Sequence, residues 1–164
     1  MSTFAKDTEV SVGKTRAEME DLLGRYGATA FGSMIEPKRA VIAFQLNGKH
    51  VRFFLPLPDP ADKKFTRRTR RSPSGYVHDI GACTPEEARA KWEQACRSKW
   101  RALFLSIKAK LVACEEGITT FEEEFLAHFV IPGGGTIGDR VIPQLMEMQT
   151  SGRIPTLQLM GGAP

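Results

Sequence analysis

Apolar residues between positions 84 and 117 recur at helical spacing and predict one long helix. Thr84 is suited to cap its N-terminus, Pro85 fits the first helical position, and Glu87 completes a capping box. Gly117 is a suitable C-terminal stop. The apolar stripe consists of Trp92, Cys96, Trp100, Leu103, Phe104, Ile107, Leu111 and Cys114. We expect this stripe to face the core. Alanines recur every seven residues on another side of the helix, at positions 95, 102 and 109, and we expect this side to allow close approach of a second helix or subunit.

Residues 28–58 carry the alternating pattern and β-branched or aromatic content of strands. Strands are expected over 28–35, 39–46 and 49–56. Asn47-Gly48 joins the last two, and this dipeptide favours a type I′ hairpin. The hairpin places five apolar residues on one face, namely Ile42, Phe44, Val51, Phe53 and Leu55. That face is predicted to pack against the long helix.

Three further helices flank this centre. One is expected from a Thr15–Glu18 capping box to Gly27, after a short strand at Val10 and Val12. Another begins at Thr119 or Thr120 and ends before Pro132, and the last covers 136–151. The predicted fold is therefore α+β: a three-stranded antiparallel sheet, made of a β-hairpin plus one strand, packed on a long helix with flanking N- and C-terminal helices. Residues 1–152 form a single domain with a long basic loop at 57–83, and residues 153–164 form a tail.

Positive charge is concentrated in one segment. Of the 23 lysines and arginines, six lie between residues 63 and 71, which leaves 17 basic against 19 acidic residues elsewhere. Such a local excess suggests contact with a polyanion. Three cysteines without a CxxC pair indicate buried thiols in a reducing compartment. No signal sequence or apolar run of membrane-spanning length is seen, so a soluble, cytoplasmic protein without membrane contact is expected.

Three groups of residues form the predicted nucleic-acid site. The loop contributes Lys63, Lys64, Arg67, Arg68, Arg70 and Arg71. The long helix contributes Arg97, Arg101 and Lys108. One face of the sheet contributes Arg52 and Phe54. The basic side chains would neutralise phosphates, while Phe54, with Phe31 or Tyr76, would stack on unpaired bases. Each group also has an explanation without nucleic acid. The basic loop is alternatively a solvated loop or a targeting signal, the basic helix residues a solvated helix face, and the sheet residues part of a half-exposed sheet.

A catalytic constellation cannot be assembled from the sequence. His78, Asp79 and Cys83 resemble metal ligands but lack a second ligand pair at a recognisable spacing. Glu124 and His128 lie four residues apart on a predicted helix, which alone is weak support for a metal site. The expectation is a protein that is not an enzyme and has no cofactor and no metal.

Two resemblances add a context. Residues 2–12, 51–58, 99–103, 107–111 and 119–128 resemble a family of small, uncharacterised phage and prophage proteins, and the resemblance covers most of the chain. Three antiparallel strands followed by a long helix, with a basic surface between them, are similar in architecture to phage and eukaryotic single-strand annealing proteins. The second resemblance matches no motif and implies only a class: rings that hold single-stranded DNA in a basic groove.

The leading hypothesis is thus an oligomeric phage protein that binds or anneals single-stranded DNA in recombination, with nucleic acid and copies of itself as partners. The alternative is a phage accessory protein that binds a host or phage protein, such as a regulator, a defence inhibitor or a virion component. Flexible apolar residues near the C-terminus motivate this alternative: Met146, Met148, Leu157, Leu159 and Met160. Packing of the last helix into the core would explain part of that set equally well.

Overall fold

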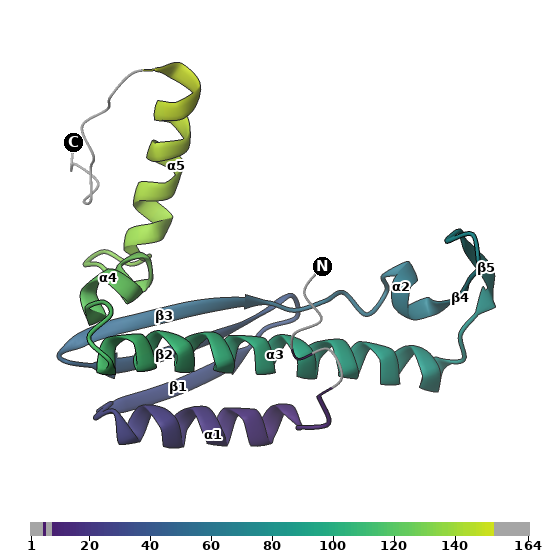
Figure 1. Ribbon diagram of the computed structural model, residues 1–164, viewed down its shortest axis with the longest axis horizontal. Coiled ribbons are helices and arrows are strands. Elements are labelled where there is room, and N and C mark those ends of the chain that lie inside the picture. The colour runs from purple at the N-terminus through teal and green to yellow at the C-terminus, as the bar shows by residue number, and fades with distance from the viewer. Residues whose placement is uncertain (1–4, 6–7, 153–164) are drawn as a thin grey trace. The chain divides into compact units, whose positions relative to one another are not determined.

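The computed structural model describes Ala5 and residues 8–152. The chain forms two compact units, one of Met1–Met19, Ile35–Ala40 and Leu55–Ser106, the other of Glu20–Met34, Val41–Phe54 and Ile107–Pro164. The helices are α1 (Val12–Arg25), α2 (Lys63–Thr66), α3 (Pro85–Glu115), α4 (Phe121–Phe125), the 3-10 turn η1 (Leu126–His128) and α5 (Ile137–Ser151). The strands are β1 (Ala30–Ile35), β2 (Arg39–Leu46), β3 (Lys49–Pro56), β4 (Arg67–Arg71) and β5 (Val77–Ala82). The predicted α+β class is confirmed, with a three-stranded antiparallel sheet, a long helix and flanking helices (Figure 1).

Helix α1 begins earlier than the sequence predicts. Ser11 caps it, because the Lys14 N–H donates to Ser11 Oγ at 3.2 Å and the Thr15 N–H donates to the Ser11 carbonyl at 2.9 Å. Thr15 is consequently buried inside the helix, and both the predicted Thr15 cap and the predicted strand at Val10–Val12 are wrong. Ser11 and Thr15 lie four residues apart and are both residue types that cap helices, and the helix begins directly after Ser11.

The central sheet has the strand order β1-β2-β3. Asn47 and Gly48 both have positive φ, 52° and 73°, as a type I′ turn requires, so the predicted hairpin is confirmed. Burial alternates along β2 and β3, and all five residues predicted for the inner face are buried. Strand β1 begins at Ala30, two residues after its predicted start.

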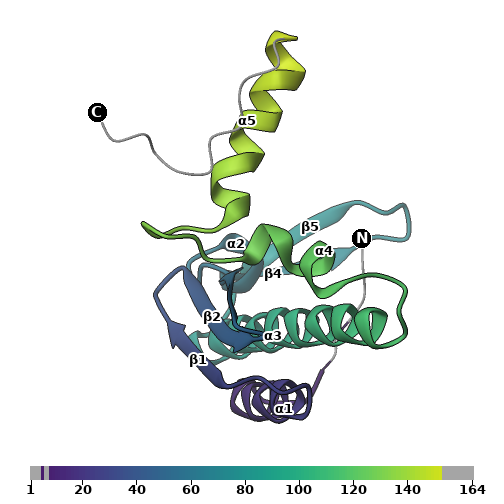
Figure 2. The same ribbon diagram turned by 90° about the vertical axis from the view of Figure 1, so that its left-hand side faces the viewer.

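Aromatic rings form the core of the second unit. Phe125 of α4 is fully buried and meets Phe44 and Phe53 edge-on, with ring centroids 6.0 Å and 6.2 Å apart. Phe121 lies 4.7 Å from Phe125 between centroids. The C-terminal parts of α1 and α3 lie along the sheet (Figure 2) and add buried Leu22, Leu23, Ile107 and Leu111. The packed rings therefore cover one face of the β2–β3 hairpin, and the residues of its other face are more exposed.

Helix α3 has the predicted ends. The Thr84 N–H donates to Glu87 Oε2 at 2.9 Å and the Glu87 N–H donates to Thr84 Oγ1 at 3.2 Å, which is a complete capping box. Gly117 follows the helix with φ of 68°. Five residues of the predicted stripe are buried, namely Cys96, Trp100, Phe104, Ile107 and Leu111, and the other three are partly exposed. The stripe is therefore narrower than the sequence indicates.

Residues 57–83 are ordered, and the prediction of a structureless loop is wrong. Asp62 accepts a hydrogen bond from the Lys64 N–H at 3.1 Å and caps α2, whose Phe65 is buried. Strands β4 and β5 then form a separate two-stranded antiparallel ribbon, residues 67–82 (Figure 1). Neither face of this ribbon is buried, so its sequence carries no hydrophobic alternation from which strands are predicted.

The C-terminal helices follow the predicted capping signals. Thr120 with Glu123, and Thr136 with Asp139, form capping boxes that open α4 and α5. Helix α4 is shorter than predicted and continues only as a 3-10 turn to His128. A Cβ on buried Gly138 would lie 2.7 Å from the Ala127 carbonyl oxygen, so glycine is required where α5 approaches η1. The predicted tail at 153–164 lies outside the described residues.

Candidate nucleic-acid interface

The β4–β5 ribbon carries four of the predicted site residues on one strand. Arg67 pairs with Ala82, Arg70 with His78 and Arg71 with Val77, and the register shifts between Arg68 and Thr69. All five residues of β4 are exposed. Alternation along the strand places Arg67 and Arg71 on one face and Arg68 and Arg70 on the other. Both faces of the ribbon therefore present guanidinium groups.

Two of these arginines are engaged in ion pairs. Arg67 Nε donates to Asp79 Oδ2 at 2.7 Å, and this hydrogen bond is the main cause that holds the Asp79 pKa below its ordinary value. Arg68 Nη2 donates to both oxygens of Glu87, each at 2.7 Å. The pKa of Glu87 is lowered first by the Thr84 N–H that it accepts and then by Arg68. These pairs fix the ribbon to itself and to the first turn of α3.

The other cations of this segment differ in pairing. Lys64 forms an ion pair with Asp62 at 3.1 Å. Lys63, Arg70 and Arg71 are exposed, and no ion pair joins them to any residue that the structure describes. Arg70 and Arg71 are thus left for contact with an external anion, whereas the charge of Lys63 also helps to lower the pKa of Asp79.

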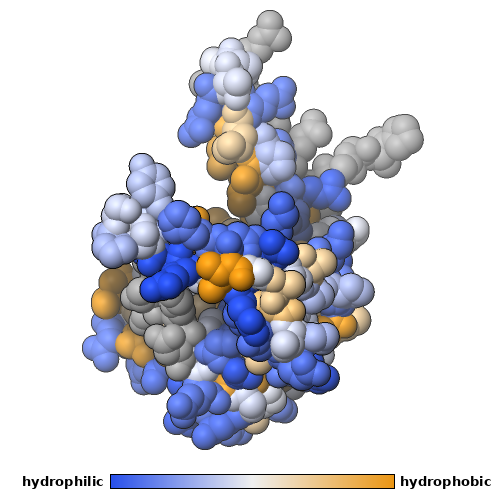
Figure 3. All heavy atoms as spheres, turned by 90° about the vertical axis from the view of Figure 1, so that its right-hand side faces the viewer, coloured by the Kyte–Doolittle hydropathy of each residue, from blue (hydrophilic) through white to orange (hydrophobic). Residues whose placement is uncertain are grey.

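Aromatic and apolar side chains accompany these charges. Tyr76 precedes β5 and is 71% exposed, and Val77 and Ile80 are 60% and 59% exposed. Figure 3, viewed from the side on which Figure 1 draws the ribbon, shows hydrophilic residues with isolated hydrophobic ones between them. A basic strand beside an exposed aromatic ring is a typical arrangement for contact with both phosphate and base.

Lysine 91 anchors the base of the ribbon. Its Nζ donates to the Arg67 carbonyl at 3.3 Å and to Cys83 Sγ at 3.1 Å. The Cys83 N–H donates to the Thr66 carbonyl at 2.8 Å. The thiol and the backbone N–H of Cys83 therefore both have hydrogen-bond partners, and the Asp79 carboxylate forms an ion pair with Arg67. Among the described residues, no group of three or more His, Cys, Asp and Glu side chains is arranged to hold a metal ion.

The predicted basic ridge on α3 is largely used for internal contacts. Arg101 pairs with Glu18, and its guanidinium lies 4.7 Å from the centroid of the Phe104 ring. Arg97 Nε donates to Gln94 Oε1 at 2.9 Å. Lys108 is exposed on the same helix. Their spacing places all three on one side of α3, as predicted, but only Lys108 is positioned to meet a ligand without first giving up an internal contact.

In the second unit, Arg52 and Phe54 lie together at a separate cavity of about 410 Å³. The Arg52 guanidinium lies 5.1 Å from the Phe54 ring centroid, which is cation–π geometry. Arg52 Nε is buried and has no hydrogen-bond partner among the described residues. The cavity is also lined by Ala127, His128, Thr136, Gly138, Asp139, Ile142 and Pro143. The Arg52 guanidinium and the Phe54 ring line the same cavity, and this pair is suited to a ligand in which an anionic group is attached to a planar ring.

His128 is a residue of this cavity that the sequence did not single out for it. Its ring stacks on Phe53 with centroids 3.9 Å apart, and burial is the main cause that lowers its pKa. Glu124, the expected partner of His128, instead accepts a hydrogen bond from Lys110 Nζ at 2.8 Å. Thr136 and Asp139, which form the capping box of α5, also line this cavity. Their position beside Arg52 depends on tertiary structure.

Phe31 and Tyr76, the other predicted stacking residues, have different surroundings. Phe31 is half-buried and, with Gln45 and His50, lines a shallow cavity of about 380 Å³ on the outer face of the sheet. His50 is exposed on that face. The outer face of the sheet is therefore at least partly open within its own unit, as stacking of bases on it would require.

Comparison with known proteins identifies no relative. No family model, no curated protein and no solved structure matches the chain. In the described part of the chain, none of the helices is long and apolar enough to cross a membrane.

Proposed function

We propose that this protein binds single-stranded DNA, with the β4–β5 ribbon as the main contact. The observation that carries the proposal is the excess of exposed positive charge on this segment: among the described residues, no ion pair involves Lys63, Arg70 or Arg71, and the exposed Tyr76 adjoins the Arg71–Val77 pair. Phosphates replace the missing partners, and release of their counterions supplies the binding free energy.

Single strands are favoured over duplex because an exposed aromatic ring accompanies the cations of the ribbon. Tyr76 is 71% exposed and offers a ring face to an unpaired base, and a base in a duplex has no free face. A two-stranded ribbon also fits the major groove of duplex DNA, so duplex is the competing ligand in the test.

Annealing and self-association extend this proposal. A protein that holds single strands by phosphate and ring contacts leaves base edges available for pairing with a complementary strand. The alanines at 95, 102 and 109 of α3 supply a small-residue surface for another copy. The protein acts in this account by binding, without a chemical step.

Fluorescence anisotropy with labelled single-stranded and double-stranded oligonucleotides of equal length tests the proposal. The titration is run at two salt concentrations, with particle size recorded by light scattering. We expect tighter binding of the single strand, with log K falling by about 0.7 per phosphate contact for each unit of log salt. Absence of binding to either form at low salt contradicts the proposal, and preference for duplex contradicts its single-strand part.

Helix α5 favours a second candidate, binding to another protein. Ile142, Leu145 and Met146 share one side of this helix and are 54%, 43% and 61% exposed. Within the described residues, only Gly138 of α5 is buried, so most of its apolar stripe is not in the core. Leu157, Leu159 and Met160 lie outside the described residues.

Affinity purification distinguishes this candidate. A partner that is recovered with the wild-type chain and lost with Leu145→Ser and Met146→Ser supports it, provided that Val112→Ser keeps the partner. Val112 is a suitable control because it is an exposed apolar residue of α3, 38% exposed, outside α5. Recovery of no partner counts against this candidate.

A further inference from the structure

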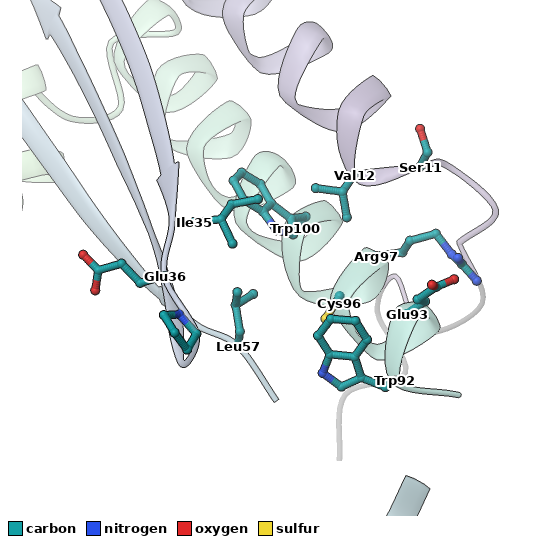
Figure 4. A pocket seen from close by; sticks show the side chains of 11 residues that line it. Ser11, Val12, Ile35, Glu36, Leu57, Trp92, Glu93, Cys96, Arg97 and Trp100 are labelled. Atoms are coloured by element: carbon teal, nitrogen blue, oxygen red, sulfur yellow. The ribbon is translucent and has the colours of Figure 1, made fainter. Parts of the chain in front are cut away.

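The first unit contains a cavity that the nucleic-acid proposal does not use. It has a volume of about 600 Å³, within the range of small-molecule sites. Its lining comes from the start of α1, the turn after β1, the segment after β3, and α3: Ser11, Val12, Ile35, Glu36, Pro37, Leu57, Trp92, Glu93, Cys96, Arg97 and Trp100. Figure 4 shows Ile35 and Leu57 facing Trp100 and Trp92 of α3 across this space.

The interior of this cavity is apolar. The charged ends of Glu36, Glu93 and Arg97 point away from the space between Leu57 and α3 (Figure 4). Each has another contact: Glu36 accepts from Arg39 at 2.6 Å, Glu93 accepts from Arg89 at 2.8 Å, and Arg97 donates to Gln94 at 2.9 Å. Arg97 donates to a neutral amide and keeps its charge, but its guanidinium points out of the interior, so a charged ligand held there would lose its hydration shell without an ionic contact.

The polar atoms closest to the interior are also occupied or weak. Trp92 Nε1 donates to the Pro58 carbonyl at 2.8 Å. Burial raises the pKa of the Cys96 thiol, so Cys96 is a neutral, weak hydrogen-bond donor at neutral pH. The cavity thus selects against ligands with several hydrogen-bonding groups, such as sugars or nucleobases.

The indole side chains of the lining favour an aromatic ligand. Trp92 is partly exposed and Trp100 is 1% exposed; both line the cavity, and Cys96 lies between them on α3. Aromatic rings in offset or edge-on contact attract one another beyond the effect of buried area. We propose that this cavity is a binding site for a small, neutral, aromatic molecule. The site is independent of DNA binding by the ribbon.

Intrinsic fluorescence offers a direct test because the chain has two tryptophans and both line this cavity. The probe is phenylnaphthylamine, a neutral aromatic molecule whose absorption overlaps tryptophan emission. We expect saturable quenching of tryptophan emission with a matching rise in probe emission. The sulfonated analogue of the same probe shares its rings but carries a negative charge, and we expect it to bind at least tenfold more weakly.

A matched pair of substitutions locates the binding. Val12→Phe fills part of the cavity, and Val112→Phe makes the same change at an exposed position of α3 that does not line it. We expect Val12→Phe to weaken probe binding at least tenfold and Val112→Phe to leave it within twofold of wild type. Circular dichroism and thermal melting confirm that both variants are folded.

Three results overturn the proposal. One is unchanged tryptophan emission up to the solubility limit of the probe, and another is equal binding by the two valine variants. The third is uptake only after removal of residues 1–7, which would mean that the site is closed to ligands in the intact chain. A DNA titration of the same samples separates this site from the ribbon, since Val12→Phe is expected to leave DNA affinity unchanged.

Discussion

The β2–β3 and β4–β5 hairpins are both antiparallel, but their surroundings are opposite. In β2 and β3, every second side chain is buried, and Phe44 and Phe53 meet the ring of Phe125. In β4 and β5, no side chain is buried, and ion pairs to Asp79 and Glu87 hold the ribbon instead. Burial in the core therefore explains the sequence of the first hairpin but not the arginines of the second, and this difference is the reason we propose a ligand for the second hairpin.

The largest expected effect comes from one substitution made in both hairpins. Ile42 of β2 is fully buried, whereas Ile80 of β5 is 59% exposed. Ile42→Ala should lower the free energy of unfolding by about 2–5 kcal/mol, because it removes buried methyl groups and leaves a cavity. Ile80→Ala should change it by less than about 0.5 kcal/mol. Urea denaturation measures both, and equal losses would contradict the contrast between the hairpins.

A smaller effect is expected from His128, which stacks on Phe53 in the packed hairpin. Burial lowers its pKa below the ordinary value of 6.5, so the unfolded chain binds this proton more readily than the folded one. The corresponding stability is fully present above the ordinary pKa and is lost as pH falls through the lowered pKa. His128→Phe keeps an aromatic ring against Phe53 and should remove this acid loss.

Urea midpoints between about pH 7.5 and about pH 5 test the histidine prediction. The matched control is His50→Phe, which changes an exposed histidine of β3. Loss of the pH dependence in the His50 variant, or its persistence in the His128 variant, would assign the titration to another group.

The smallest effect concerns the ion pairs of the ribbon. The pKa of Asp79 is lowered chiefly by the hydrogen bond from Arg67, so its stabilisation is present above the ordinary carboxyl pKa and is lost as pH falls through the lowered one. At neutral pH, Asp79→Asn should speed amide exchange in β4 and β5 and leave exchange in β2 and β3 unchanged. Asp21→Asn, an exposed change on α1, is the control. Equal exchange in Asp79→Asn and wild type would show that the pair does not hold the ribbon.

Much of the fold follows from local signals in the sequence. The Asn47-Gly48 turn, the Thr84–Glu87 box and the alternating residues of β2 and β3 each have a local physical cause, and the structure has all three. The predicted start of α1 is wrong because Thr15 and Glu18 match the capping-box pattern, whereas Ser11, the observed cap, has Lys14 three residues later.

The sequence suggests residues for the candidate site but not how they are arranged in space. A strand with both faces exposed leaves no hydrophobic period, so β4 and β5 were taken for a loop. The basic residues Arg97, Arg101 and Lys108 of α3 have the predicted spacing, but Arg101 forms an ion pair with Glu18, which is distant in the sequence. The cavity beside Arg52 and the one between Trp92 and Trp100 bring together residues from separate elements, which no local pattern encodes.

The salt dependence of single-strand binding by a double variant of the ribbon tests the central claim most directly. Arg70→Ala with Arg71→Ala removes two exposed charges that have no ion pair among the described residues. Lys14→Ala with Arg89→Ala removes the same charge from exposed positions of α1 and α3. We predict weaker binding for the ribbon variant and a slope of log K against log salt that is shallower by about 1.4, or ~0.7 for each lost phosphate contact. Equal affinity and equal slope for the two double variants would contradict a DNA contact by the ribbon.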